Sequence, residues 1–412
     1  MTERGSDLAA QWTLDPSVDF LNHGSHGACP IEVLEAQRTW RDRMEAEPVA
    51  FLSRELEEHL DAARTELARF IGARPDDVAF VPNATTGIAT VLRSLRFAAG
   101  DELLTTDHEY NAILNALRFA ADRDGARVVV AAIPFPIADA EEAADAIARA
   151  VTPRTRFAIV SHVASPTGLI LPIERIVANL AERGVDCLVD GAHAPGMIEL
   201  ELDLLGAAYY VGNAHKWLFG PKGSAFLQVR ADRQAAIRPL AISHGANSER
   251  TDRTRFRLEA DWTGTADPTA YLSLPTAIGF GERLRAGGWA ATRIADRALV
   301  LAGRDRLCRA LGIAQPGPDA MLGSMATIPL PGGPWPRDQD PLAARLFERH
   351  RIEVPIGPFP VPAAREGAAP ARLRLLRISA APYNRLAQYD RLADALVAEL
   401  EVEAGRAGSS TP

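Results

Sequence analysis

Short apolar runs that alternate with helical segments over most of the first 280 residues constrain the fold of this chain more than any other feature. The runs read as buried strands, among them VAFVP, RVVVAAI, RFAIVSHV, VDCLVD and AAYYVG. The segments between them, such as YNAILNALRFAADRD and PIERIVANLAERG, have the apolar spacing of amphipathic helices. Strands that are joined by helices run parallel, so the pattern predicts an α/β fold with a largely parallel sheet covered by helices.

The alternation fades beyond about residue 280, where helical stretches such as ADRALVLAGRDRLCRALG are followed by turns rich in Pro and Gly. We therefore predict a large domain over residues 21–281 and a smaller domain formed by residues 282–412 together with 1–20. A chain of 412 residues with 47% hydrophobic residues is long enough for one large core and a second, smaller one.

Composition excludes several classes of partner. The net charge of -8 provides no basic stripe for nucleic-acid phosphates. No stretch approaches the roughly 18 apolar residues of a membrane span, and the start MTERGSDLAA lacks the order of a signal peptide. The three cysteines stand singly, without the spacing of a disulfide framework or a metal site. We expect a cytoplasmic protein with no metal, nucleic-acid or membrane partner.

Lysine is rare in this chain, and its two occurrences lie close together. The only lysines are Lys216 and Lys222, and all the remaining residues of the 45 basic ones are arginines. Chemistry that needs a primary amine able to lose its proton cannot use arginine instead. A retained lysine is therefore more informative here than in most chains.

Polar residues follow two neighbouring strands of the predicted sheet. Asp190 ends the strand VDCLVD, and Asn213, His215 and Lys216 follow the strand AAYYVG. The carboxyl ends of parallel strands share the edge at which α/β sheets bind ligands. Pyridoxal-5′-phosphate (PLP) needs a lysine for its Schiff base and a buried carboxylate that keeps its pyridine nitrogen protonated, so that the ring accepts carbanion electrons. Singly, such an aspartate is more often structural and such a lysine a solvated charge, but together they predict a PLP site.

The segment VPNATTGIATVLRSL places small and hydroxylated residues at the start of a helix that follows another strand. Backbone N–H groups at a helix N-terminus, together with Thr85 or Thr86, suit a phosphate group. Asn83, Thr85 and Thr86 would serve equally well as ordinary helix caps. We place Ala84, Thr85 and Thr86 in a candidate phosphate site.

Eight ordered segments resemble the class V branch of fold-type I PLP-dependent enzymes, and within it the isopenicillin N epimerase-like proteins. They are FLNHGSHGACP, VPNATTGIATVL, LTTDHEYNAIL, SHVASPTGLILP, LVDGAHAPG, NAHKWLFGPKGSAFL, WTGTADPTAYLSLPTA and LRISAAPYN. The resemblance implies a fold-type I PLP-dependent transferase fold, with a mostly parallel seven-stranded sheet in the large domain and a smaller α+β C-terminal domain.

The resemblance also implies roles for individual residues. Lys216 matches the Schiff-base lysine, Asp190 the partner of the pyridine nitrogen, and His108 a histidine stacked over the cofactor ring. The remaining expected cofactor contacts are Ser165 and His193 near the phenolic oxygen, Thr85, Asn213 and His215 at the phosphate, and Thr265 from the neighbouring subunit of a homodimer.

The substrate side of the site follows from two further motifs. Arg377 in LRIS matches an arginine that grips the substrate carboxylate, a task for which its planar fork is suited. The alternative is that RLRLLRIS is an ordinary strand with charged outward positions, but we favour the carboxylate role of Arg377. Asn22 and Ser25 in LNHGSHG are expected at the entrance, and His26 stands where relatives often have an aromatic residue.

The reaction expected from the resemblance is epimerisation at the α-carbon of an amino acid, with Lys216 as the base that removes the α-proton. A β-lyase that cleaves C–S bonds of cysteine or its conjugates is the alternative, followed by an aminotransferase. Cys308 falls in the helical pattern RDRLCRALG rather than on a mobile loop, which disfavours a persulfide mechanism. A PLP-binding module without turnover is the alternative from another class.

Overall fold

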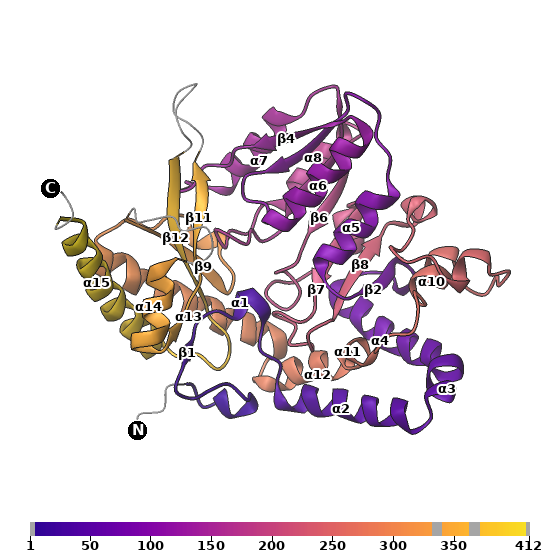
Figure 1. Ribbon diagram of the computed structural model, residues 1–412, viewed down its shortest axis with the longest axis horizontal. Coiled ribbons are helices and arrows are strands. Elements are labelled where there is room, and N and C mark those ends of the chain that lie inside the picture. The colour runs from indigo at the N-terminus through magenta and orange to yellow at the C-terminus, as the bar shows by residue number, and fades with distance from the viewer. Residues whose placement is uncertain (1–4, 332–339, 362–370, 409–412) are drawn as a thin grey trace.

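A seven-stranded sheet forms the centre of the computed structural model, which describes residues 5–331, 340–361 and 371–408 (Figure 1). All its strands are parallel except β8, which is antiparallel to both neighbours. In spatial order the strands are β2 (Val78–Val81), β8 (Ala225–Val229), β7 (Tyr209–Asn213), β6 (Asp186–Asp190), β5 (Thr155–Ser161), β3 (Glu102–Thr106) and β4 (Arg127–Ala131). The predicted α/β fold with a mostly parallel seven-stranded sheet is confirmed.

Helices cover both faces of this sheet and bury their apolar stripes against it. On one face lie α5 (Ala84–Ser94) and α6 (Asn111–Asp124), and on the other lie α4 (Leu56–Ile71), α7 (Ala140–Ala150) and α8 (Ile173–Glu182). Ile88 and Leu117 belong to the first core, whereas Leu67, Ile147 and Ile176 belong to the second. Burial of such stripes on both faces explains why the strands are apolar throughout instead of alternating.

A second, antiparallel sheet forms the C-terminal part and has the order β11 (Ile356–Val361), β12 (Ala371–Ser379), β9 (Met325–Leu330). Beside it lie α13 (Gly288–Leu311), α14 (Pro341–His350) and α15 (Leu386–Gly408), which Figure 1 shows on the side away from the large sheet. The predicted boundary between residues 281 and 282 falls within α12 (Leu274–Leu284) and stays a prediction.

The N-terminal segment connects the two sheets. Strand β1 (Asp19–Phe20) pairs in parallel with β10 (Ile352–Glu353) beside the C-terminal part. The chain then forms α1 (His23–His26) and α2 (Ile31–Ala46), and α2 packs against α12. The remaining helices are short: α3 (Pro48–Ala50), α9 (Leu202–Leu205), α10 (Arg255–Ala260) and α11 (Thr269–Leu272). Segments far apart in the sequence therefore meet around α1.

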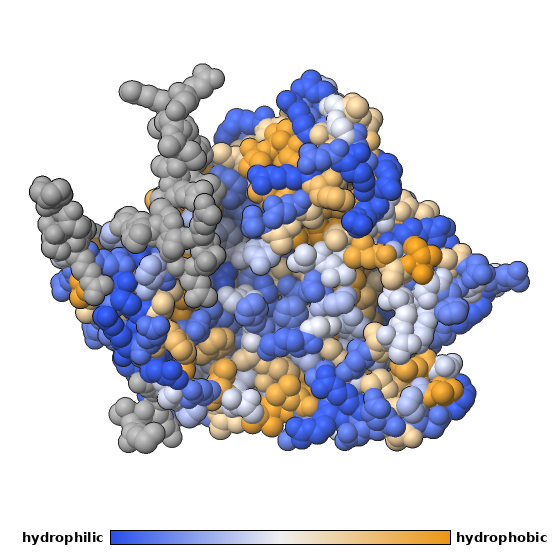
Figure 2. All heavy atoms as spheres, in the orientation of Figure 1, coloured by the Kyte–Doolittle hydropathy of each residue, from blue (hydrophilic) through white to orange (hydrophobic). Residues whose placement is uncertain are grey.

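The surface shows hydrophobic residues in separate patches among hydrophilic ones on the face seen in Figure 2. Within the described ranges, no helix combines the length and the apolar character that a bilayer span needs.

Candidate active site

A cavity of about 350 Å³ lies at the carboxyl edge of the large sheet and contains Lys216. Parallel strands bring their carboxyl ends to this edge, which is why residues from distant motifs meet there. The structure places the following residues singled out in the sequence in its wall: Ser25, His26, Asn83, Ala84, Thr85, Ser165, Asp190, His193, Asn213, His215, Lys216 and Arg377.

Lys216 presents to this cavity an amine that loses its proton near neutral pH. Burial and the nearby charge of Arg377 lower the pKa of Lys216 from 10.5 to about 7. Its Nζ lies 3.1 Å from Nε2 of His193, whose Nδ1 accepts a hydrogen bond from Trp217 Nε1 at 3.4 Å. We therefore assign the imidazole proton to Nε2, which donates to the neutral amine. A neutral amine is the form that reacts with an aldehyde.

The N-terminal segment fixes the backbone of Lys216. His23 is fully buried, and its Nε2 lies 3.0 Å from the carbonyl oxygen of Lys216, while Tyr383 Oη lies 2.7 Å from its Nδ1. Gly27 has a φ of 71°, and a Cβ there would lie 2.2 Å from the His215 carbonyl oxygen and 2.9 Å from Lys216 Cα. Sequence reasoning missed His23, although it lies in the quoted motif LNHGSHG.

Asp190 lies at the end of β6, buried beside a second carboxyl group. Its Oδ1 accepts a hydrogen bond from the Ala192 N–H at 2.9 Å. Glu109 is also buried and accepts from Ser161 Oγ at 2.9 Å. Burial and the charge of Asp190 raise the pKa of Glu109 to about 8, so Glu109 is protonated near neutral pH. Burial also raises the pKa of Asp190, but the hydrogen bond from the Ala192 N–H opposes this shift, so the negative charge of the pair belongs on Asp190.

Because Glu109 is protonated, Asp190 carries the only negative charge of the two carboxyl groups. That charge can pair with a protonated pyridine nitrogen. Sequence reasoning missed Glu109, and the only available signal was its place in DHEYN, directly after a strand. The buried carboxylate therefore suits the ring nitrogen of PLP.

The N-terminus of α5 forms the other end of the cavity. Asn83 caps the helix by accepting from the Thr86 N–H at 2.8 Å, and Asn213 Oδ1 accepts from the Ala84 N–H at 2.8 Å. Thr85 lines the cavity, and its N–H and hydroxyl have no hydrogen-bond partner in the part of the chain that the structure describes. A helix of 11 residues with a free first-turn donor fits a phosphate group.

Arg377, on β12, is a buried cation without an acidic partner among the described residues. Its Nη1 donates to the Ser165 carbonyl oxygen and Oγ at 2.7 and 3.1 Å, and its Nη2 donates to Ser25 Oγ at 3.0 Å. Its Nε is buried and has no hydrogen-bond partner within the described ranges. Burial lowers the pKa of Arg377 to about 10. An unpaired buried cation is costly, so a carboxylate ligand would stabilise it.

The entrance residues differ in their distance from the cavity. Ser25 donates to Asn22 Oδ1 at 2.6 Å, and Asn22 lies behind Ser25 rather than in the wall. His26 is exposed in the wall. Asn22 can therefore act only through Ser25, which in turn contacts Arg377.

His108 does not line the cavity with Lys216. Both its ring nitrogens are engaged elsewhere, Nδ1 with Thr167 Oγ1 at 2.9 Å and Nε2 with the Ile133 carbonyl oxygen at 3.1 Å. Its ring packs edge-on against Phe359. The aromatic residue that lines the cavity is Tyr110, two positions later. The expected place of His108 over the cofactor ring therefore stays a prediction, for a side chain that is buried and bonded within the protein through both ring nitrogens.

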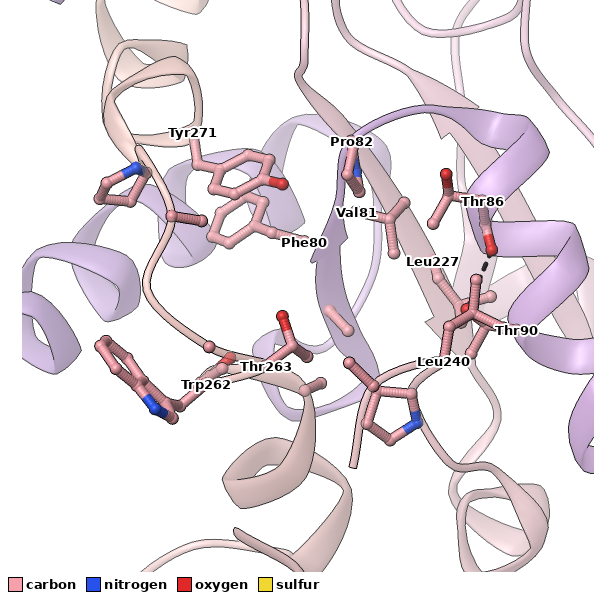
Figure 3. Close-up of a pocket in the computed structure, with 18 of the residues that line it drawn as sticks. Phe80, Val81, Pro82, Thr86, Thr90, Leu227, Leu240, Trp262, Thr263 and Tyr271 are labelled. Atoms are coloured by element: carbon pink, nitrogen blue, oxygen red, sulfur yellow. Dashed lines mark hydrogen bonds between the residues drawn. The ribbon is translucent and has the colours of Figure 1, made fainter. Parts of the chain in front are cut away.

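Thr86 and Thr265 also lie outside the cavity wall. Figure 3 shows Thr86 on a neighbouring apolar pocket, across from Trp262, Thr263 and Tyr271. Thr265 belongs to the same loop as Trp262 and Thr263 and is exposed. Neither threonine lines the phosphate end of this cavity.

The chain matches the aminotransferase class-V family model over residues 24–392. It is 37% identical to isopenicillin N epimerase of Amycolatopsis lactamdurans over 405 residues, which cover 94% of this chain and 96% of the relative. It is 36% identical to isopenicillin N epimerase of Streptomyces clavuligerus, over 93% of this chain and 95% of the relative. It is 31% identical to a probable chloroplastic L-cysteine desulfhydrase of Arabidopsis thaliana, over 93% and 83%.

Solved structures share the fold at lower identity. A lysine-to-alanine mutant of C-DES, with glycine covalently linked to its PLP cofactor, has a TM-score of 0.75 at 22% identity and covers 95% of this chain and 99% of that one. A cysteine desulfurase from Thermococcus onnurineus NA1 has a TM-score of 0.75 at 21% identity, with 97% and 98% covered. These neighbours confirm the predicted fold-type I architecture.

Proposed function

Because the chain belongs to the class V aminotransferase family, we propose that this PLP-dependent enzyme is an amino-acid epimerase that acts at the α-carbon. One observation carries the proposal: a single cavity holds the neutral amine of Lys216, the buried carboxylate of Asp190 and the unpaired cation of Arg377. When bound, PLP supplies an electron sink for the negative charge that develops at the α-carbon.

The residues of this cavity divide the work of holding the cofactor. Lys216 would hold the aldehyde carbon and Asp190 the pyridine nitrogen. His193 and Ser165 would lie near the phenolic oxygen, and Thr85, Asn213 and His215 near the phosphate. The free donors of Thr85 and the neutral state of Lys216 support this assignment.

Arg377 orients the substrate through its carboxylate. The guanidinium is held by Ser165 and Ser25, so its position is fixed before a ligand arrives. A planar fork accepts a carboxylate through two parallel hydrogen bonds. This contact would direct the α-proton toward the Lys216 amine, whose Nζ then takes the proton as general base.

Inversion requires a second proton donor on the opposite face, and we assign this role to Tyr110. Tyr110 lines the same cavity, on the loop between β3 and α6, whereas Lys216 follows β7. Strands β6, which carries Asp190, and β5 lie between β7 and β3 in the sheet. The phenol is close enough to Arg377 to affect that residue's pKa, which it raises against the larger effect of burial. The Tyr110 hydroxyl would give its proton to the face opposite Lys216.

The test incubates the holoenzyme with single enantiomers of amino acids in D₂O. Chiral chromatography and mass spectrometry should show the opposite enantiomer with deuterium at the α-carbon. Tyr110→Phe should retain deuterium exchange without inversion, because Lys216 still serves one face. The epimerase proposal is wrong if a broad panel shows no exchange, or if keto acids accumulate instead of the opposite enantiomer.

A C–S β-lyase is the second candidate, because L-cysteine desulfhydrases are also relatives at 29–31% identity and elimination needs only the Lys216 base. The three cysteines of the chain are all buried, and Cys308 lies inside α13. Elimination without a protein persulfide is therefore the lyase route that fits. Release of thiol with a keto acid would identify a lyase, whereas a keto acid without thiol release would identify an aminotransferase.

We propose a homodimer in which Thr265 contacts the phosphate bound by the partner subunit. Its exposed loop beside the apolar pocket of Figure 3 supports this assignment, because Thr265 cannot serve its own cavity. Analytical ultracentrifugation should show a dimer, and Thr265→Ala should weaken PLP retention without changing the tryptophan fluorescence of the fold. A fully active monomer would contradict the proposal.

A further inference from the structure

A second chamber of about 450 Å³ adjoins the catalytic cavity, between the start of α6 and the strands β11 and β12. Tyr110, Ser165 and Arg377 line both spaces. The two chambers therefore meet at the residue that we propose to hold the substrate carboxylate. A volume of this size belongs to the range of small-molecule pockets, which is about 300–1,000 Å³.

The position of this chamber follows from the geometry of an α-carbon. The amino group of a substrate must approach Lys216, and its carboxylate must approach Arg377. The side chain then leaves in a third direction and needs space close to Arg377. The second chamber is such a space, since it begins at Arg377 and Tyr110.

The wall of the chamber consists mainly of hydrocarbon. Leu114 comes from α6, Ile356 and Phe359 come from β11, and Leu375 comes from β12. Burial of an apolar side chain against such a wall strengthens binding by about 10- to 150-fold relative to leaving it in water.

The charged groups of the chamber argue against an acidic side chain. Asp107 and Glu109 lie in its wall, and Arg377 is its only cation among the described residues that line it. Burial raises the pKa of Asp107 to about 6, and Glu109 is protonated near neutral pH. A second carboxylate on the substrate would find no cation beyond the one that holds the first, and it would lose its hydration.

We propose that this chamber binds the substrate side chain and selects amino acids whose side chains are large, uncharged and mainly hydrocarbon, such as aliphatic, aryl or thioether groups. It disfavours both cysteine-sized and acidic side chains. The inference rests on the proposed function, because it needs the substrate carboxylate on Arg377. It holds for epimerisation and for elimination alike.

Gly357 allows the chamber to be narrowed without distorting the protein. It lies on β11 opposite Leu375, and a Cβ built on it meets no atom of the described residues within 4 Å. Its φ is outside the left-handed region, so a side chain is not strained there. Gly357→Leu should fill part of the chamber, whereas Leu114→Arg should add a cation to it. Asn115→Arg, on the exposed side of the same helix, is the matched control.

The experiment titrates the holoenzyme and its variants with leucine, phenylalanine, methionine, alanine, cysteine and 2-aminoadipate. Binding is measured from the change in cofactor absorbance and from the rise in melting temperature, and turnover from α-deuterium exchange. In the unmodified enzyme we expect phenylalanine and leucine to bind at least 10-fold more tightly than alanine and 2-aminoadipate.

The variants make the inference specific to the chamber. Gly357→Leu should weaken phenylalanine binding at least 10-fold and leave alanine binding unchanged. Leu114→Arg should strengthen binding of 2-aminoadipate relative to that of phenylalanine, and Asn115→Arg should not. If alanine or cysteine binds best and Gly357→Leu changes nothing, the chamber is not the side-chain site, although the proposed function stands. If no amino acid changes the absorbance of the holoenzyme, the proposed function itself fails.

Discussion

Replacement of Arg377 by lysine is the most informative single change, because it keeps the charge and removes the fork. In the structure the guanidinium is already held through Nη1 by Ser165 and through Nη2 by Ser25, and it has no acidic partner among the described residues. A substrate carboxylate would therefore form an ion pair with a cation that otherwise has none. Lysine offers one point charge where arginine offers two parallel donors.

The magnitude follows from the contacts that are lost. Arg377→Lys removes about one charge-assisted hydrogen bond, worth about 1.5–3 kcal/mol, which corresponds to a rise of about 10- to 150-fold in apparent Kd. Arg377→Met removes the charge as well and should cost about 2–5 kcal/mol, or about 30- to 4,000-fold. The cofactor-free Arg377→Met protein should nevertheless be as stable as the parent or more so, because it no longer buries an unpaired cation.

The assay compares an amino acid with the amine that lacks its carboxylate, using the change in cofactor absorbance as a measure of binding. Substitution of Arg377 should weaken binding of the amino acid and leave binding of the amine unaffected. Arg233→Lys serves as the control, since Arg233 pairs with Asp186 at the other end of β6. Equal losses for amino acid and amine, or no loss for either, would refute the assignment of Arg377 to the carboxylate.

Three further perturbations test the cofactor side of the cavity. Lys216→Ala should abolish the visible absorbance of the bound cofactor, whereas Lys222→Ala, which loses only a hydrogen bond to the Gly27 carbonyl oxygen, should keep it; the reverse result would exclude Lys216 as the attachment site. Because the pKa of Lys216 is lowered to about 7, its amine is neutral above that pH, so the rate of PLP uptake by the cofactor-free protein should rise with pH and level off above about pH 8; a rate that still climbs toward pH 10 would indicate an ordinary lysine. Gly27→Ala should destabilise the protein by about 1–3 kcal/mol in urea unfolding and impair PLP retention, because its Cβ would collide with His215 and Lys216. Gly100→Ala has a similar φ and open space around it, so it separates backbone strain from this collision.

The sequence predicted the sheet and the main residues of the cavity for the same physical reason. Asp190 and Asn213 end their strands and Lys216 follows β7, and parallel strands gather such residues at one edge. Lys216 was also marked by the scarcity of lysine in the chain. Composition and periodicity were therefore sufficient to predict the edge at which the site lies.

Side-chain direction within a loop could not be predicted in this way. In DHEYN the sequence favoured His108, but the turn before α6 directs that ring into the core and leaves Tyr110 in the cavity wall. His23 and Glu109 were missed because their partners, Tyr383 and Asp190, are distant in sequence. A period of two or 3.6 residues predicts faces of regular elements, and these residues lie outside or at the ends of such elements.

The contacts around His23 have a consequence for the order in which the protein matures during synthesis. His23 meets Tyr383 across 360 residues, and the Gly24 N–H donates to Ser379 Oγ across 355. When strands β2 to β8 have emerged from the ribosome, the nascent chain already contains Lys216 and Asp190. It still lacks Ser379 and Tyr383, the partners that hold α1 in place. Closing so long a loop comes late in folding. Productive uptake of the cofactor should therefore be a post-translational event, completed only after residue 383 has emerged.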